Sequence, residues 1–178
     1  MKLTIGIDGD GVIFDYVQGL RESFPAAANS PGPFTYNMVE DGWFPSKQHW
    51  LDAHHEVMAR CHDLPLNDTS SAEAVDRLRT AGHRVVLATA RSPKYEAGTI
   101  ANLALHGIEV DDVIHTGYSV SKTTLSLDVL IEDKPDTIRE LLTTSIRPVM
   151  YLQPYNENED LAVDKVRTMN EFADLLLH

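Results

Sequence analysis

The sequence predicts an α/β fold in which a Rossmann-like parallel sheet carries helices on both faces. From about residue 70 onward, short apolar runs typical of buried strands alternate with helical patterns. An earlier apolar run, Leu3 to Ile7, has the same character and belongs to the same sheet. The segment between them shows helical patterns, interrupted by a loop at 29–33, and no strand pattern. We therefore expect a core domain of residues 1–14 and 69–178 and a small helical cap, residues 15–68, inserted after the first strand.

The cap is expected to contain three helices. The first follows Asp10, where apolar and polar positions from Val12 onward recur at helical spacing, and it ends near Ser23. A short helix is expected at 36–41, and Ser46 is expected to cap a longer one at 47–61. The cap is also rich in aromatic residues, among them Tyr16, Phe34, Tyr36, Trp43, Phe44 and Trp50.

The rest of the chain supplies the other strands and helices. Ser70 and Glu73 form a capping-box pattern at the start of a helix that Gly82 ends. The elements expected after it are a strand at 84–88, a helix from Ser92 and Pro93 to about 107, strands at 112–115 and 128–131, a helix from Pro135 to about 142, a strand at 148–152 and a helix at 166–177. The acid-rich run 156–160 is expected to be a solvated loop.

Composition excludes several classes of partner. The 178 residues carry a net charge of −12, which argues against polynucleotide binding, because the phosphate backbone requires a basic surface. No apolar run approaches the length that spans a membrane. Cys61 is the only cysteine, so a reducing, cytoplasmic location is expected. A homodimer is left open.

Polar groups gather where the predicted strands end. They are Asp8 with Asp10, Thr89 with Arg91, Lys122, and Glu132 with Asp133. The carboxyl ends of parallel strands meet at one edge of a sheet, so these groups are expected in a single crevice. Adjacent carboxylates repel each other unless a cation separates them, and Mg²⁺ prefers oxygen ligands. The pattern therefore predicts a magnesium site that handles an anion.

This set of residues suits phosphoryl transfer. Asp8 can attack phosphorus to form an aspartyl phosphate, and Asp10 can act as the general acid and base. The Thr89 hydroxyl and nearby backbone amides can bind phosphate oxygens, while Lys122 supplies a positive charge and Asp133 completes the metal site. Ala90 and Arg91 directly follow Thr89 and are expected to contact the substrate.

In this order, the motifs resemble those of the haloacid dehalogenase superfamily, in its phosphatase branch. The first is Asp8-Gly9-Asp10-Gly11-Val12 after an apolar strand, the second is Thr89 at a strand end, the third is Lys122, and the fourth is Ile131-Glu132-Asp133. The resemblance spans most of the chain. It implies a phosphatase in which Mg²⁺ is bound by Asp8, the Asp10 carbonyl and Asp133.

Within this superfamily the chain is most similar to the 5′(3′)-deoxyribonucleotidases. Their fourth motif resembles Leu130-Ile131-Glu132-Asp133-Lys134-Pro135-Asp136, apart from Glu132 for Asp and Lys134 for Arg. The resemblance implies a 5′-nucleotidase that acts on small (deoxy)ribonucleoside monophosphates. It also implies that the cap selects the base and that Glu132 lies behind the metal ligands.

Two alternatives stay open on the sequence alone. One is a phosphatase or phosphomutase for another metabolite, such as a sugar phosphate. The other is a Mg²⁺-binding receiver-like module without catalytic activity. Tyr16 follows the first motif closely enough to face a substrate, whereas His54 and His55 are expected on a solvated helix and Trp50 in the core of the cap.

Overall fold

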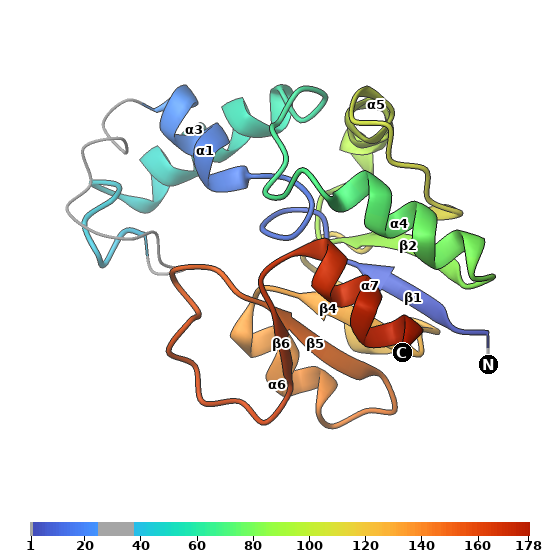
Figure 1. The fold of residues 1–178 in the computed structure, drawn as a ribbon. Coiled ribbons are helices and arrows are strands. Elements are labelled where there is room, and N and C mark those ends of the chain that lie inside the picture. The colour runs from blue at the N-terminus through green and yellow to red at the C-terminus, as the bar shows by residue number, and fades with distance from the viewer. Residues whose placement is uncertain (1, 25–37) are drawn as a thin grey trace.

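The computed structural model of this chain describes residues 2–24 and 38–178, and its core is a single parallel sheet. Six strands follow the order β3-β2-β1-β4-β5-β6, and every neighbouring pair is parallel (Figure 1). They are β1 (Thr4–Ile7), β2 (Arg84–Thr89), β3 (Asp112–His115), β4 (Val129–Glu132), β5 (Arg147–Tyr151) and β6 (Asp164–Val166). The predicted α/β class and parallel sheet are confirmed.

Helices connect the strands, and most of them begin or end within a few residues of the expected positions. They are α1 (Tyr16–Ser23), α3 (Lys47–Ala59), α4 (Ser71–Thr80), α5 (Glu96–Leu105), α6 (Pro135–Leu141) and α7 (Met169–Leu177), with 3₁₀ turns at Pro93–Tyr95 and Lys122–Thr124. The turn at Pro93–Tyr95 replaces the first turn of the helix expected from Ser92. None of the helices in the described part of the chain is long and apolar enough to cross a membrane.

The alternation of side chains along the strands produces two separate cores. Ile5 and Ile7 of β1 point to one face, where they join a cluster that includes α4 and α7 residues such as Leu78 and Phe172. On the other face, Leu130 packs with residues that include Leu127 and Leu141 of α6. Apolar residues therefore occur at consecutive strand positions, as expected for a sheet that helices cover on both sides.

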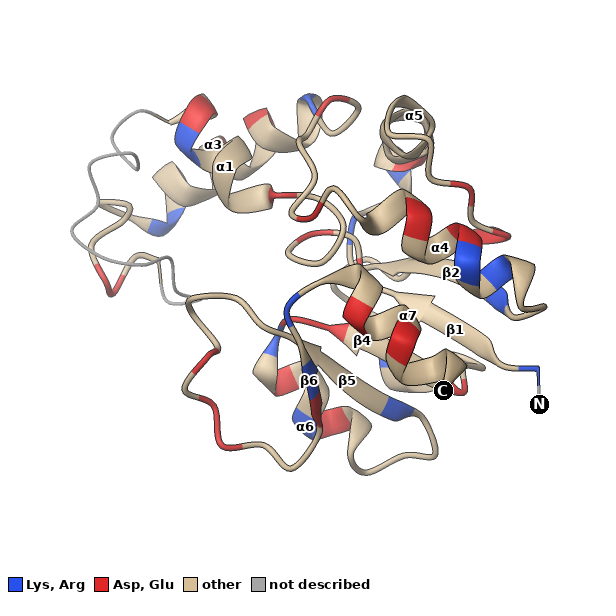
Figure 2. Ribbon diagram, viewed as in Figure 1, with Lys and Arg blue, Asp and Glu red and all other residues tan. Residues whose placement is uncertain are grey.

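Charged residues are spread over the outer surfaces of these layers. On α4 the acidic positions come first and the basic positions follow, whereas α7 and the loop between β5 and β6 are mainly acidic (Figure 2). Arg77 of α4 pairs with Asp174 of α7 at 2.5 Å, which joins the two helices that lie side by side. Such exposed pairs contribute little to stability, on the order of 1 kcal/mol or less each.

The inserted segment lies beside the carboxyl edge of the sheet, where α1 and α3 pack against each other (Figure 1). Gly19 permits this contact, because a Cβ there would meet Leu64 at 2.7 Å and Val57 at 3.1 Å. Of the short helix expected at 36–41, residues 36 and 37 lie outside the described residues, and residues 38–41 form a turn. Phe34 and Tyr36 also lie outside them.

The helix expected directly after Asp10 begins later than predicted. Residues 11–14 form a tight turn in which the amides of Ile13 and Phe14 both donate to the Gly9 carbonyl at 2.9 Å. Val12, Ile13 and Phe14 are fully buried, so their apolar pattern reflects burial rather than a helix face. The helix starts at Tyr16, and Asp15 caps it by accepting a hydrogen bond from the Gln18 amide at 2.8 Å.

The capping box predicted at Ser70 and Glu73 is wrong. The Ser70 side chain makes no capping bond to its helix and donates instead to Asp68 at 2.5 Å. The same Asp68 oxygen accepts a hydrogen bond from the Met169 amide at 2.6 Å. Asp68 therefore joins the start of α4 to the start of α7, a long-range contact that no local pattern could reveal.

The last part of the chain contains a strand that the sequence did not indicate. Residues 164–166 form the edge strand β6, and the helix expected from 166 begins at Met169 instead. Only Val166 of this strand is buried, so its three residues show no apolar pattern. Thr168 caps α7 by accepting a hydrogen bond from the Glu171 amide at 3.1 Å.

Candidate active site

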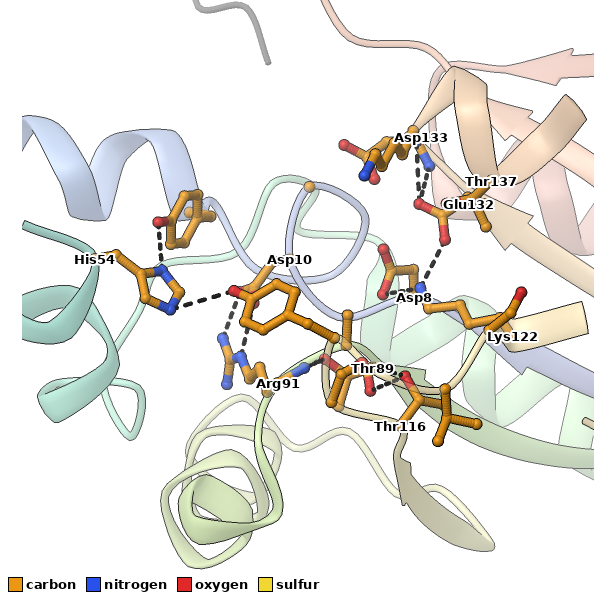
Figure 3. A pocket seen from close by; sticks show the side chains of 18 of the residues that line it. Asp8, Asp10, His54, Thr89, Arg91, Thr116, Lys122, Glu132, Asp133 and Thr137 are labelled. Carbon is orange, nitrogen blue, oxygen red and sulfur yellow. Dashed lines mark hydrogen bonds and ion pairs between the residues drawn. The ribbon is translucent and has the colours of Figure 1, made fainter. Parts of the chain in front are cut away.

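A cavity of about 680 Å³ opens over the carboxyl edge of the sheet. It is walled on one side by the strand ends of the core and on the other by α1 and α3 (Figure 3). All eight residues that the sequence suggested for chemistry, substrate or metal line it: Asp8, Asp10, Tyr16, Thr89, Ala90, Arg91, Lys122 and Asp133. Strand register explains the convergence, because Ile7 pairs with Leu87 on one side and with Ile131 on the other.

Asp8 lies at the centre of the site and shares a cation with Glu132. The Lys122 ammonium is 2.6 Å from Asp8 Oδ1 and 2.6 Å from Glu132 Oε2 (Figure 3). All three side chains are buried, and Gly9 donates its amide to Asp8 Oδ1 at 2.7 Å. Asp8 is therefore held in one orientation at the end of the central strand β1.

Burial and neighbouring charges shift the titration of this group. Burial raises the pKa of the Asp8 carboxyl well above its ordinary value, and Glu132 raises it further while Lys122 opposes both. Burial alone would lower the pKa of Lys122, but the carboxylates of Asp8 and Glu132 outweigh it and raise that pKa. Lys122 is therefore a permanent positive charge. An additional cation would favour the ionised form of Asp8.

The charge in the site is suited to such a cation. Asp8, Glu132 and Asp133 each offer an oxygen, and these three oxygens lie within 4.8 Å of one another. Asp8 and Glu132 share one cation, Lys122, while Arg91 pairs with Asp10 outside this group. A buried group of oxygen donors of this kind fits Mg²⁺.

Glu132 has partners at both of its oxygens. Oε2 accepts from Lys122, while Oε1 accepts from the amides of Asp133 at 3.1 Å and Lys134 at 3.0 Å. Burial by itself would raise the pKa of Glu132, but the charge and hydrogen bond of Lys122, helped by the side chains of Asp133 and Asp8, outweigh it and lower that pKa. Glu132 therefore orients Lys122 and the loop that carries Asp133.

Asp10 has a different environment from Asp8. Arg91 donates from Nε to one Asp10 oxygen at 2.9 Å and from Nη2 to the other at 2.6 Å. Arg91 is almost fully buried, contacts Thr99 Oγ1 at 3.1 Å, and lies over the Phe14 ring. The guanidinium of Arg91, which the sequence suggested as a substrate contact, lies on Asp10 and orients that carboxylate.

Thr89 and Ala90 also line the cavity. The Thr89 hydroxyl accepts a hydrogen bond from the Arg91 amide at 3.2 Å, so its own proton can point toward a ligand. A Cβ at Gly9 would come within 3.0 Å of this hydroxyl, so the first motif and the end of β2 are in close contact. Thr116, after β3, supports β2 by donating to the Thr89 carbonyl at 3.2 Å.

The opposite wall is aromatic and includes residues that the sequence suggested were structural or solvated. His54 Nδ1 is 2.7 Å from the Tyr16 hydroxyl, and its Nε2 is 3.3 Å from the Tyr118 hydroxyl (Figure 3). The Trp50 ring stacks against the His54 ring. Trp50 was expected in the core of the cap and His54 on a solvated helix, but both line the cavity. Desolvation lowers the pKa of His54, although Asp10 acts to raise it.

Two residues that line the site, Tyr118 and Tyr155, were not singled out from the sequence. They follow β3 and β5, at the same edge of the sheet as the four motifs. The rule that parallel strands carry chemistry at their carboxyl ends could have indicated both loops. Neither loop has a phosphate-binding pattern, and the acidic run 156–160 of the second was interpreted as solvated, so only the position after a strand was available as a signal.

Comparisons with known proteins identify the fold. No family model matches the sequence, and no curated protein matches it significantly. A haloacid dehalogenase-like hydrolase from Streptococcus pneumoniae superposes with a TM-score of 0.69 at 16% identity, covering 98% of each chain. A candidate HAD-hydrolase from Bacillus subtilis, bound to magnesium, gives 0.65 at 10% identity over 100% of both chains.

A third neighbour is L-2-haloacid dehalogenase from Xanthobacter autotrophicus with chloropropionic acid covalently bound. It gives a TM-score of 0.64 at 10% identity, and the match covers 99% of each chain. At these identities the comparisons show shared architecture alone. The chain therefore has the fold of the haloacid dehalogenase superfamily hydrolases.

Proposed function

We propose that this protein is a Mg²⁺-dependent phosphomonoester hydrolase and that its substrates are nucleoside monophosphates. One observation carries the proposal: the two carboxylates that follow β1 form ion pairs with different cations. Asp8 lies against Lys122 within the acidic group, whereas Asp10 lies against Arg91 outside it. Carboxylates in distinct environments can take distinct roles, one as nucleophile and the other as proton donor and acceptor.

Asp8, Asp133 and the backbone carbonyl of Asp10 would hold the metal. Bound Mg²⁺ neutralises charge on a phosphoryl group. Lys122, fixed between Asp8 and Glu132, contributes a permanent positive charge at the same place. The Thr89 hydroxyl contributes a hydrogen-bond donor for a phosphate oxygen.

The proposed reaction has two steps. In the first, an Asp8 oxygen attacks phosphorus, the bond between phosphorus and the ester oxygen breaks, and Asp10 gives its proton to the departing oxygen. In the second, water attacks the phosphorus of the aspartyl phosphate and Asp10 takes up a proton from that water. The Asp8–phosphorus bond then breaks, which releases inorganic phosphate and regenerates both carboxyl groups.

The role of Asp10 can be tested with leaving groups of different basicity. Asp10→Asn is expected to lower kcat on an alkyl phosphate by about 10²- to 10⁴-fold, because a general acid contributes that much. The loss on an aryl phosphate should be smaller, since a phenolate leaves without protonation. The measurement is kcat for both esters with wild type and variant. Equal losses on the two esters would remove Asp10 from this role.

The aromatic wall of the cavity supports the choice of a nucleotide. Tyr118 is 76% exposed and lines the pocket, so its ring has a free face. Tyr16 is largely buried and its hydroxyl is engaged by His54. A planar base fits against such rings, and stacking in single-strand complexes contributes roughly 1–3 kcal/mol per base. The preference for deoxyribose over ribose is supported by the sequence resemblance only.

The substrate is tested by comparing kcat/KM over a panel of deoxyribonucleoside and ribonucleoside 5′-monophosphates and sugar phosphates. We expect nucleotides to be favoured over sugar phosphates by about 5- to 150-fold, the equivalent of the stacking energy. Tyr16→Ala and Tyr118→Ala should each reduce this ratio, and Tyr16→Phe serves as the control that keeps the ring. Equal turnover of sugar phosphates would refute the nucleotidase assignment and leave a general phosphatase or phosphomutase.

The receiver-like alternative predicts a different product. After treatment with acetyl phosphate or a substrate, a receiver would keep phosphate on the protein, whereas a hydrolase releases it. A quench experiment that counts protein-bound and free phosphate with time separates the two. L-2-chloropropionate is added to the substrate panel, because the structural neighbours include an L-2-haloacid dehalogenase.

A further inference from the structure

The loop that follows β5 makes unusual contacts for a surface loop rich in acidic residues. It leaves the sheet after Tyr151, runs outward and returns as β6 (Figure 1). Its acid-rich part was expected to be solvated, yet Asn156 is completely buried. A buried amide side chain requires hydrogen-bond partners, and those of Asn156 indicate what this loop does.

Asn156 ties the loop to the backbone of the acidic site. Its Nδ2 donates to the Asp133 carbonyl at 2.7 Å and to the Tyr151 carbonyl at 2.9 Å, while its Oδ1 accepts from the Gln153 amide at 2.8 Å. Three bonds from one side chain connect the end of β5, the turn of the loop and the residue after β4. The loop therefore has a fixed position relative to Asp133.

The same short segment reaches the side chains of the site. The Tyr155 hydroxyl donates to Asp133 Oδ2, and Gln153 Nε2 donates to the Gly11 carbonyl at 2.8 Å. Gly11 has a φ of 89°, and a Cβ on it would fall 2.2 Å from Asp133 Oδ2. The first and fourth motifs thus touch at Gly11 and Asp133, and residues 153–156 hold both.

We propose that Tyr155 is a positioning residue for the metal site, an inference that rests on the proposed function. Its hydrogen bond to one Asp133 oxygen fixes the rotation of the carboxylate and keeps lone pairs in place for a cation. Partners behind a metal ligand commonly change metal affinity by 10- to 100-fold when they are removed. The hydrogen bonds of Asn156 and Gln153 hold the loop, and with it Tyr155, in a fixed position next to Asp133.

The test is direct Mg²⁺ binding, measured by calorimetry without any substrate. Tyr155→Phe keeps the ring and removes only the hydroxyl, so the protein should fold. We expect its Kd for Mg²⁺ to rise by about 10- to 100-fold. Saturating Mg²⁺ should restore most of the lost kcat, and the melting temperature without Mg²⁺ should change little. Tyr95→Phe, which removes a tyrosine hydroxyl from the turn before α5, is the control and should keep the wild-type Kd.

Each outcome bears on a different conclusion. An unchanged Kd in Tyr155→Phe, with wild type binding Mg²⁺, would overturn the positioning role and leave the proposed function intact. Weaker Mg²⁺ binding in the variant, with no phosphate released from any substrate by wild type, would support the positioning role and refute the function. A wild type that does not bind Mg²⁺ would refute both.

Discussion

Asp8→Asn is expected to abolish phosphate release while leaving the protein folded. The amide cannot form the bond to phosphorus, and removing a nucleophile in a well-characterised protease lowers kcat by about 10⁶-fold. Folding should survive because Lys122 keeps its second partner, Glu132, at 2.6 Å. The substitution also removes one of two neighbouring buried carboxyl groups. Burial and Glu132 raise the pKa of Asp8, so its charged form is unfavourable in the folded protein and its loss should not destabilise the fold.

Two measurements check this expectation. Steady-state release of phosphate should fall to background, and rapid acid quenching with labelled substrate should trap phosphate on wild type but not on Asp8→Asn. Glu132→Gln is the matched control, because it changes another acid that pairs with Lys122 and should retain measurable turnover. Normal kinetics in Asp8→Asn would exclude Asp8 as the nucleophile, and with it the two-step reaction.

Removal of divalent metal is expected to stop turnover completely, and Mg²⁺ should restore it. The reason is electrostatic: Asp8, Glu132 and Asp133 are buried together, and Lys122 alone does not balance their charge, so without the metal they would repel an incoming phosphate. Asp133→Ala should eliminate activity or shift the Mg²⁺ requirement far upward. Asp133→Asn is a second variant, which removes the negative charge but keeps the shape of the side chain.

Activity should be measured in excess chelator and then across a Mg²⁺ series for wild type, both Asp133 variants and Glu132→Gln. We expect the requirement to rise most in Asp133→Ala and least in Glu132→Gln. Full activity of wild type in excess chelator would refute the mechanism as a whole. A normal Mg²⁺ requirement in Asp133→Ala would place the metal elsewhere.

The sequence predicted those site residues that lie at the carboxyl ends of strands. Asp8, Thr89 and Asp133 each follow an apolar run, and a parallel sheet brings such ends together whatever the details of packing. The sheet itself could be predicted for the same reason. The acids and the strands are local patterns, so one sequence is enough to find them.

The remaining features depend on contacts between distant segments. Nothing near Arg91 indicates that its guanidinium lies on Asp10, and nothing near Tyr155 indicates that its hydroxyl reaches Asp133. The edge strand β6 has a single buried residue, which leaves no periodicity to detect. His54 was expected on a solvated helix, but its ring contacts the hydroxyls of Tyr16 on α1 and of Tyr118 after β3.

The central place of β1 in the sheet has a consequence for how the protein folds. β1 pairs with β2 on one side and β4 on the other, and both partners come much later in the chain. Pairings this distant must overcome a large loop-closure entropy, which slows their formation. Asp8 and Asp133 come together only when β1 pairs with β4. Mg²⁺ should therefore bind the folded protein and not the unfolded chain. A higher Mg²⁺ concentration should therefore slow unfolding or shift the folding equilibrium toward the folded protein. The initial collapse of the chain should not depend on Mg²⁺.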